Sequence, residues 1–145
     1  MAEGFAQRLS GVDENSVFAR VESAALEHTS SVNPDAIEAM ATVGIDITRQ
    51  YSKMLADFSA DDFTIVISMC GCGATVPDVW KFSKRFEDWN VPDPTGGSKQ
   101  DFETARNEIQ SRVQELASSI KEKRSPTYSL YEADACPLLK PAKLS

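Results

Sequence analysis

The chain has 145 residues, of which 22 are acidic and 15 basic, giving a formal net charge of −7. This length fits one ordinary domain, and a hydrophobic share of 41% is enough for one sizeable core. The acidic balance lacks the positive surface that attracts nucleic acid or an anionic membrane, so we expect neither as a partner. The longest apolar stretch, 64–69, is too short to span a bilayer, and no signal-peptide pattern opens the chain, which predicts a cytoplasmic protein.

Hydrophobic periodicity predicts alternating helices and strands. Asn33 and Pro34 are typical of an N-cap and first helical position, and Ser98 precedes a run of apolar residues in helical steps from Phe102 to Ile120. The run 63–69 has no polar face, which favours a strand buried on both sides of a parallel sheet. The expected elements are a helix over 2–9 ended by Gly11, a strand over 16–23, a helix from Asn33 to Gly44, a short helix over 53–58, a strand over 63–69, a helical turn over 77–80, a strand over 81–86, a loop over 88–97 and a helix from Ser98 to about 124.

This alternation predicts an α/β domain over 1–123, built as a three-layer open parallel sheet flanked by helices. Residues 124–145 contain three prolines and no sustained period, which predicts an extended or mobile tail. Ligands of such sheets bind beyond the carboxyl ends of the strands, and Cys70 directly follows the expected strand 63–69. Three cysteines, two of them in the Cys70-Gly-Cys72 spacing, suit redox or metal chemistry better than a disulfide framework.

Four stretches of the chain carry a resemblance to a known family. They are Met-Ala-Glu-Gly-Phe at 1–5, Val-Asn-Pro through Gly-Ile-Asp-Ile at 32–47, Val-Ile-Ser-Met-Cys-Gly-Cys-Gly at 66–73, and Glu-Asp-Trp-Asn-Val-Pro-Asp-Pro at 87–94. In this order and spacing the chain resembles the low-molecular-weight protein tyrosine phosphatases and, within them, the arsenate reductases. The resemblance covers residues 1 to about 123 and implies the fold of that family.

The resemblance also has one departure. Family members open with a hydrophobic strand and a Cys-x5-Arg anion-binding loop, whereas this chain starts at the methionine that follows the loop. We expect an N-terminally truncated version of a working enzyme rather than a degenerate product, because the downstream motifs are intact. Since the first strand is central in the family's sheet, we also expect poor stability.

The resemblance implies the reduction of arsenate to arsenite. In that interpretation a loop thiolate attacks arsenate, Asp93 protonates the leaving oxygen, and Cys70 and Cys72 resolve the adduct as a disulfide forms; their order of attack stays open. Apart from the resemblance, Asp93 is typical of a turn residue before proline, and a cysteine at a strand end is commonly inert. The alternatives are a phosphatase, disfavoured because Thr95 stands where family phosphatases usually carry tyrosine, and a non-catalytic relic or binding module.

No bound cofactor or metal is expected. The resemblance implies arsenate or a phosphate-like oxyanion as substrate and reducing equivalents from glutathione and glutaredoxin or from thioredoxin, with the Cys-Gly-Cys spacing closer to the glutaredoxin-coupled type. A zinc site from Cys70, Cys72, Cys136 and His28 fits no common spacing, and Cys136 could be a spare or an extra resolving thiol. Arg49, Lys53 and Lys84 could add positive potential near an anion site.

Overall fold

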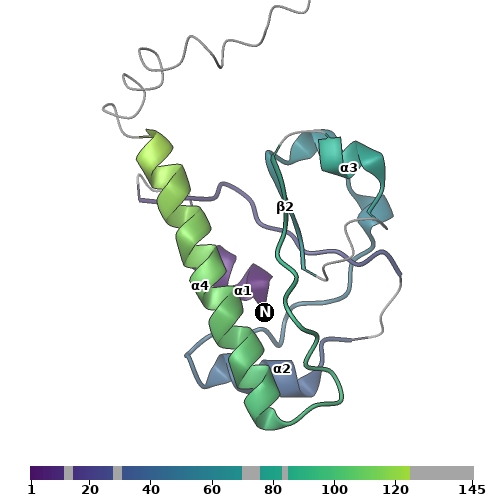
Figure 1. The fold of residues 1–145 in the computed structure, drawn as a ribbon, viewed down its shortest axis with the longest axis vertical. Helices are drawn as coiled ribbons and strands as arrows, with labels where there is room; N and C mark the ends of the chain where they lie inside the picture. The colour runs from purple at the N-terminus through teal and green to yellow at the C-terminus, as the bar shows by residue number, and fades with distance from the viewer. Residues whose placement is uncertain (12–14, 28–30, 70–75, 83–84, 125–145) are drawn as a thin grey trace, which may run out of the picture.

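The computed structural model describes residues 1–11, 15–27, 31–69, 76–82 and 85–124 (Figure 1). Its elements are α1 (Ala2–Gln7), α2 (Pro34–Ala41), the 3-10 helices η1 (Leu55–Asp57) and η2 (Ala60–Asp62), β1 (Ile65–Ser68), α3 (Asp78–Phe82), β2 (Arg85–Asp88) and α4 (Lys99–Arg124). The predicted extended or mobile tail lies outside the described residues beyond Arg124.

The start of α2 follows from its capping residues. The Asn33 side chain accepts the Asp35 backbone N–H at 2.9 Å, and Pro34 occupies the first helical position, where its missing N–H costs no hydrogen bond. The helix ends at Ala41, and Gly44 in the following turn has φ 74°, a conformation that glycine adopts without a steric penalty. The predicted helix is confirmed.

Helix α4 is the longest element and is also capped as predicted. The Ser98 N–H donates to Asp101 Oδ2 at 2.7 Å, and the Asp101 N–H donates back to Ser98 Oγ at 3.3 Å. The apolar steps predicted from the sequence face inward along most of the helix. Its buried side chains are Phe102, Ala105, Ile109, Val113, Leu116 and Ala117. Neither α4 nor any other helix in the described ranges combines the length and apolar character needed to cross a membrane.

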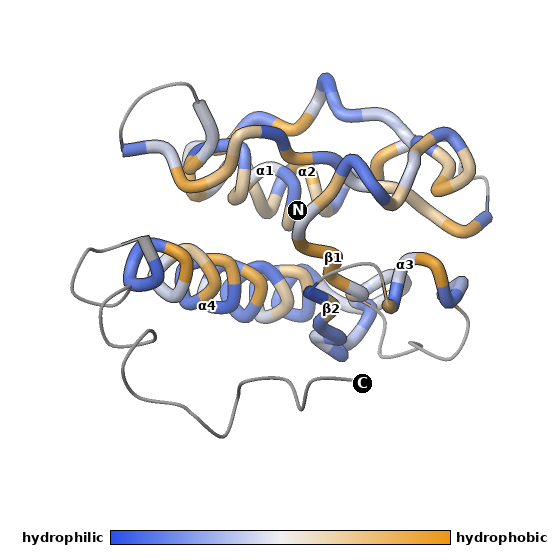
Figure 2. The backbone as a smooth tube through the Cα atoms, turned by 90° about the horizontal axis from the view of Figure 1, so that it is seen from above, coloured by the Kyte–Doolittle hydropathy of each residue, from blue (hydrophilic) through white to orange (hydrophobic). Residues whose placement is uncertain are grey.

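The hydrophobic core lies between α4 and the first two helices. Figure 2 shows α1 and α2 on one side of the molecule and α4 on the other, with β1 between them. Met40 and Ile47 are fully buried in this core. Close packing at α1 requires a glycine, because a Cβ at Gly4 would lie 2.8 Å from Ile47 Cγ2. The α1 segment is therefore fitted against the chain that follows α2.

The sheet pairs β1 with β2 in parallel, from Ile65 opposite Arg85 to Ser68 opposite Asp88. This pairing agrees with the predicted α/β class, although the sheet has two strands among the described residues. The prediction of a strand buried on both sides was wrong for 65–67, which are half-buried. The predicted strand 81–86 was placed too early, because residues 78–82 form α3 before the chain reaches β2.

Two predictions near the N-terminus were also wrong. Helix α1 begins at Ala2 as predicted but ends at Gln7, two residues before the predicted end at residue 9. Segment 16–23 forms one isolated parallel bridge, between Ser10 and Phe18, and no strand. Its side chains instead contact other loops: the Arg20 guanidinium lies 5.2 Å from the centre of the Phe63 ring. Alternating apolar residues were therefore insufficient without a neighbouring strand to pair with. In the predicted short helix 53–58, the structure has the 3-10 turn η1.

A charged cluster holds three distant segments together. The Lys53 ammonium lies 3.4 Å from Glu3 Oε2 and 2.7 Å from Glu22 Oε2, and both Lys53 and Glu3 side chains are at most 12% exposed. Gln7 donates to Glu3 Oε1 at 2.8 Å, and the Ser23 hydroxyl donates to Glu3 Oε2. Burial alone would lower the pKa of Lys53, but hydrogen bonding to Glu22 and the nearby carboxylate charges raise it overall. The cluster thus connects α1 to two loops through a largely buried ion pair between Lys53 and Glu3.

Replacing Lys53 with methionine should lower the free energy of unfolding by about 3 kcal/mol, because the buried Glu3 carboxylate loses its counter-charge. Urea denaturation at neutral pH measures the change. Lys99→Met is the matched control, since the ion pair of Lys99 with Glu38 is exposed to solvent and should contribute far less to stability. Equal losses in the two variants would contradict the prediction.

The same cluster should make stability depend on acid. The hydrogen bond from Lys53 lowers the pKa of Glu22 in the folded protein. Its stabilisation is therefore complete above the ordinary glutamate pKa and is lost as the pH falls through the lowered value. Denaturation midpoints measured from neutral to acidic pH should converge for the wild type and Lys53→Met, and parallel curves would overturn this expectation.

Candidate functional site

The carboxyl ends of β1 and β2 lie at the same edge of the sheet because the strands are parallel. Beyond the ladder itself, the Trp89 N–H donates to the Ser68 carbonyl at 2.8 Å and the Val91 N–H donates to the Met69 carbonyl at 3.2 Å. The loop after β2 therefore stays beside β1 up to the residue before Cys70. The side chains of Trp89 and Val91 are also buried in the core, where they are 5% and 7% exposed.

Asp93 follows this anchored segment and faces solvent. Its Oδ1 atom accepts the Thr95 backbone N–H at 3.0 Å, and Gly97 N–H donates to the Pro94 carbonyl at 2.9 Å. Gly96 closes the turn with φ 81°, which a side chain would resist. The carboxylate is thus held at the tip of a turn that is itself fixed at both ends, by Val91 and by α4.

The environment of Asp93 favours its charged form. Hydrogen bonds from the Thr95 side chain and its backbone N–H hold the pKa of Asp93 below its ordinary value, and they outweigh the slight burial, which acts in the other direction. In the absence of a ligand the carboxylate is therefore ionised at neutral pH. Sequence patterns did not assign this role to Thr95. An Asp side chain that accepts the backbone N–H two residues later is nevertheless a known turn pattern.

The other predicted site residues include five that lie outside the described residues: Cys70, Cys72, Cys136, His28 and Lys84. Among the residues that the structure does describe, no group of three or more His, Cys, Asp or Glu side chains could hold a metal ion. Lys53, expected to add positive potential, is neutralised by Glu3 and Glu22 in the cluster described above.

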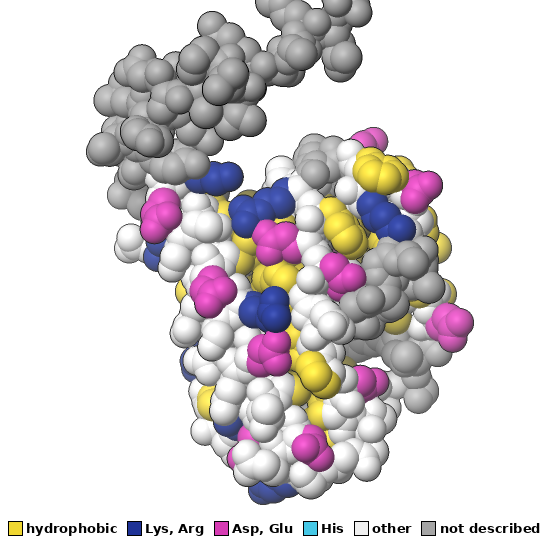
Figure 3. Space-filling model, viewed as in Figure 1, with side chains coloured by type: hydrophobic (Ala, Val, Ile, Leu, Met, Phe, Trp, Pro, Cys, Tyr) yellow, Lys and Arg dark blue, Asp and Glu magenta, His cyan; other side chains and the backbone are white. Residues whose placement is uncertain are grey.

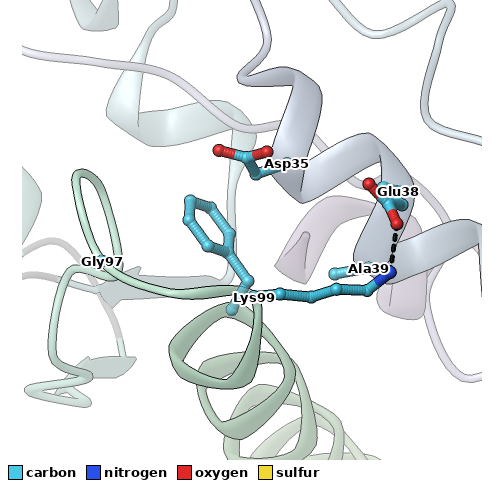
Figure 4. A pocket seen from close by; sticks show the side chains of 6 residues that line it. Asp35, Glu38, Ala39, Gly97 and Lys99 are labelled. Carbon is cyan, nitrogen blue, oxygen red and sulfur yellow. Dashed lines mark hydrogen bonds and ion pairs between the residues drawn. The ribbon is translucent and has the colours of Figure 1, made fainter.

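A small pocket of about 80 Å³ lies at the base of the 93–97 loop, between α2 and the start of α4 (Figure 4). Phe102 lines it together with Asp35, Ala39 and Gly97. Its charged groups are largely satisfied, since Lys99 binds Glu38 across the opening. Asp93, the one predicted catalytic residue within the described ranges, does not line this pocket, so the sheet edge beside Met69 is the better candidate site.

An α/β domain that gathers the loops after two parallel strands at one edge has the layout in which such sheets bind ligands. The chain belongs to the family described as low molecular weight phosphotyrosine protein phosphatase, whose model matches residues 1–126. The family resemblance drawn from the four sequence stretches is confirmed.

Within this family, the chain is similar to relatives and solved structures that are named as arsenate reductases. A glutaredoxin arsenate reductase of Synechocystis is 43% identical over 120 residues, covering 83% of this chain and 87% of that protein. Arsenate reductase 1 of Staphylococcus haemolyticus is 34% identical over 125 residues, covering 83% and 86%. A structure of an arsenate reductase in the oxidized state matches with TM-score 0.73 and 44% identity, and one in the phosphate binding state with TM-score 0.71 and 43% identity; each match covers 82% of this chain and 86% of the other.

The hydrogen bonds from Thr95 should lower the measured pKa of Asp93. Its carboxyl carbon should titrate in NMR with a midpoint below the ordinary aspartate value of about 3.9. Thr95→Val removes only the hydroxyl and should raise the midpoint in part, whereas Thr95→Pro also removes the N–H and should raise it further. A midpoint that is the same in all three proteins would refute this account of the charge on Asp93.

Proposed function

We propose that this chain reduces arsenate to arsenite through a cysteine thiol relay, with Cys70 and Cys72 as relay thiols and Asp93 as the acid. The observation that carries the proposal is the hydrogen bond from Val91 to Met69, which ties the loop of Asp93 to the residue directly before Cys70. Two relatives support the proposal: proteins that are 43% and 34% identical to this chain are named as arsenate reductases.

The reduction needs a donor of two electrons, and two thiols that become a disulfide supply them. Arsenic gains two electrons, which come from two thiols as they leave as a disulfide, and one arsenate oxygen departs as water after protonation. Gly71 and Gly73 flank the relay cysteines in the sequence and give the backbone the freedom to bring each sulfur to an adduct. A direct Cys70–Cys72 disulfide would close a small strained ring, which makes it easy to reduce.

Asp93 must carry a proton to act as an acid, although its pKa is lowered in the free protein. An oxyanion bound beside the Asp93 carboxylate would favour its protonation, because a nearby negative charge raises the pKa of a carboxyl group. In this proposal Asp93 therefore takes up its proton with the substrate. We assign the regeneration of the thiols to glutathione and glutaredoxin, with thioredoxin as the alternative.

The test is arsenate-dependent NADPH oxidation coupled through glutathione and glutaredoxin. The 145 residues contain no Cys-x5-Arg sequence, so the chain is assayed as it stands and with a hydrophobic strand and Cys-x5-Arg loop placed ahead of Met1. Turnover of arsenate in either form supports the proposal. Hydrolysis of aryl phosphates without arsenate turnover would favour the phosphatase alternative, and silence in both assays would favour a non-catalytic relic or binding module.

The relay itself is tested in whichever form is active. Cys70→Ser and Cys72→Ser should each abolish steady arsenate turnover while leaving any aryl phosphatase activity, because only the reduction needs resolving thiols. Cys136→Ser is the matched control and should keep full turnover. Full turnover in both relay variants would remove these thiols from the mechanism.

The acid is tested separately from the thiols. Asp93→Asn keeps the size and the acceptor oxygen of the side chain but cannot give up a proton, so turnover should fall by about 100-fold or more. Circular dichroism should remain unchanged, because the side chain lies at an exposed turn. Turnover within a few-fold of the wild type would show that Asp93 is only a turn residue.

A further inference from the structure

Glu87 on β2 binds the indole of Trp89. Its Oε2 atom accepts the Trp89 Nε1–H at 2.8 Å, and its Oε1 atom accepts the Arg85 Nε–H at 2.7 Å. Alternate residues of an extended strand lie on the same face, which brings these three side chains together. A tryptophan has one polar hydrogen, and a buried indole needs a partner for it. Glu87 therefore determines where the N–H of the Trp89 ring points.

The Glu87 carboxylate is half-buried and lies among basic groups. Burial alone would raise the pKa of Glu87, but the hydrogen bonds from Trp89 and Arg85 and the charges of Arg85 and Arg112 lower it overall. Arg112 belongs to α4, where it also pairs with Glu108 at 3.0 Å. Figure 3 shows acidic and basic side chains close together on the face of the molecule where Figure 1 draws β2 beside α4. Glu87 is thus an ionised acceptor at neutral pH.

Trp89 begins the segment that carries Asp93. Its backbone N–H donates to the Ser68 carbonyl, and two residues later the Val91 N–H donates to the Met69 carbonyl. The ring of Trp89 is buried in the same hydrophobic core as the inner face of α4. Because protein interiors are close-packed, a buried ring that turns also shifts the backbone that holds it. The orientation of the Trp89 ring therefore affects the position of the loop that follows.

We propose that Glu87 is a positioning residue for the candidate site: its carboxylate orients the Trp89 indole, and Trp89 holds the segment from which the loop of Asp93 leaves the core. Glu87 acts through Trp89 and contacts no substrate in this proposal. The inference rests on the proposed function, in which Asp93 is the acid. It adds that kcat depends on a side chain six residues before that acid, while substrate affinity does not.

The test compares variants of the hydrogen bond between Glu87 and Trp89. Glu87→Leu removes the acceptor, whereas Glu87→Gln keeps an acceptor oxygen for the indole. Arg85→Met is the matched control, because it removes the other partner of Glu87 and leaves the indole hydrogen bond in place. Amide hydrogen exchange at Val91 reports on the segment, and exchange at Ile109 in α4 reports on the stability of the whole domain.

In Glu87→Leu the Val91 amide should exchange about 10-fold faster relative to that of Ile109, because the buried indole loses its partner. In whichever form of the chain turns arsenate over, kcat should fall about 10-fold with KM unchanged, since a misplaced acid slows the chemical step. Glu87→Gln and Arg85→Met should keep both properties within a few-fold. Trp89→Phe removes the donor and should reproduce the effects of Glu87→Leu, and combining these two substitutions should add little.

Three results would overturn the proposal. Unchanged exchange at Val91 in Glu87→Leu would show that Glu87 does not hold the segment. Equal acceleration at Val91 and Ile109 would reduce Glu87 to a contributor to global stability. A normal kcat in Glu87→Leu, with turnover lost in Asp93→Asn, would show that the acid is positioned without Glu87. If no form of the chain turns arsenate over, the proposed function fails by itself, and the exchange rates still decide whether Glu87 holds the segment.

Discussion

The parallel pairing of β1 with β2 is the constraint on which the candidate site depends. Its hydrogen bonds continue past the strands through Trp89 to Ser68 and through Val91 to Met69. Because a parallel ladder aligns both carboxyl ends, two segments that are about 20 residues apart in the sequence emerge at one edge. Trp89 and Val91 are both buried, so the loop that carries Asp93 leaves the core beside the end of β1.

The first helix depends on charge as well as on packing. Glu3 is one of only two buried polar side chains in the described part of the chain, and it is stabilised by Lys53, Gln7 and Ser23. A buried carboxylate without such partners would cost several kcal/mol, so the position of α1 against Ile47 depends on Lys53, Gln7 and Ser23 lying beside Glu3. The arrangement favours one docking of α1 over alternatives that apolar contacts alone would permit.

The electrostatics of Asp93 connect the fold to the proposed chemistry. A turn that donates hydrogen bonds from Thr95 holds the side chain in place, and the same bonds keep it ionised. The interaction with Thr95 therefore has two opposite effects. It holds the Asp93 carboxylate in place, as an acid requires, but it also lowers the pKa of this carboxyl group, which disfavours the protonated form. The proposed reaction resolves the conflict through its own substrate, since an approaching oxyanion raises the proton affinity of the carboxylate.

Local features of this protein could be predicted from neighbouring residues in the chain. The caps at Asn33 and Ser98 and the inward face of α4 depend on such neighbours, and the family motifs identified the fold. Long-range packing settled that 16–23 would not be a strand, because a strand requires a partner from elsewhere in the chain. It likewise settled that Lys53 is neutralised by Glu3 and Glu22, since these ion pairs join residues that are far apart in the sequence and that local patterns do not connect.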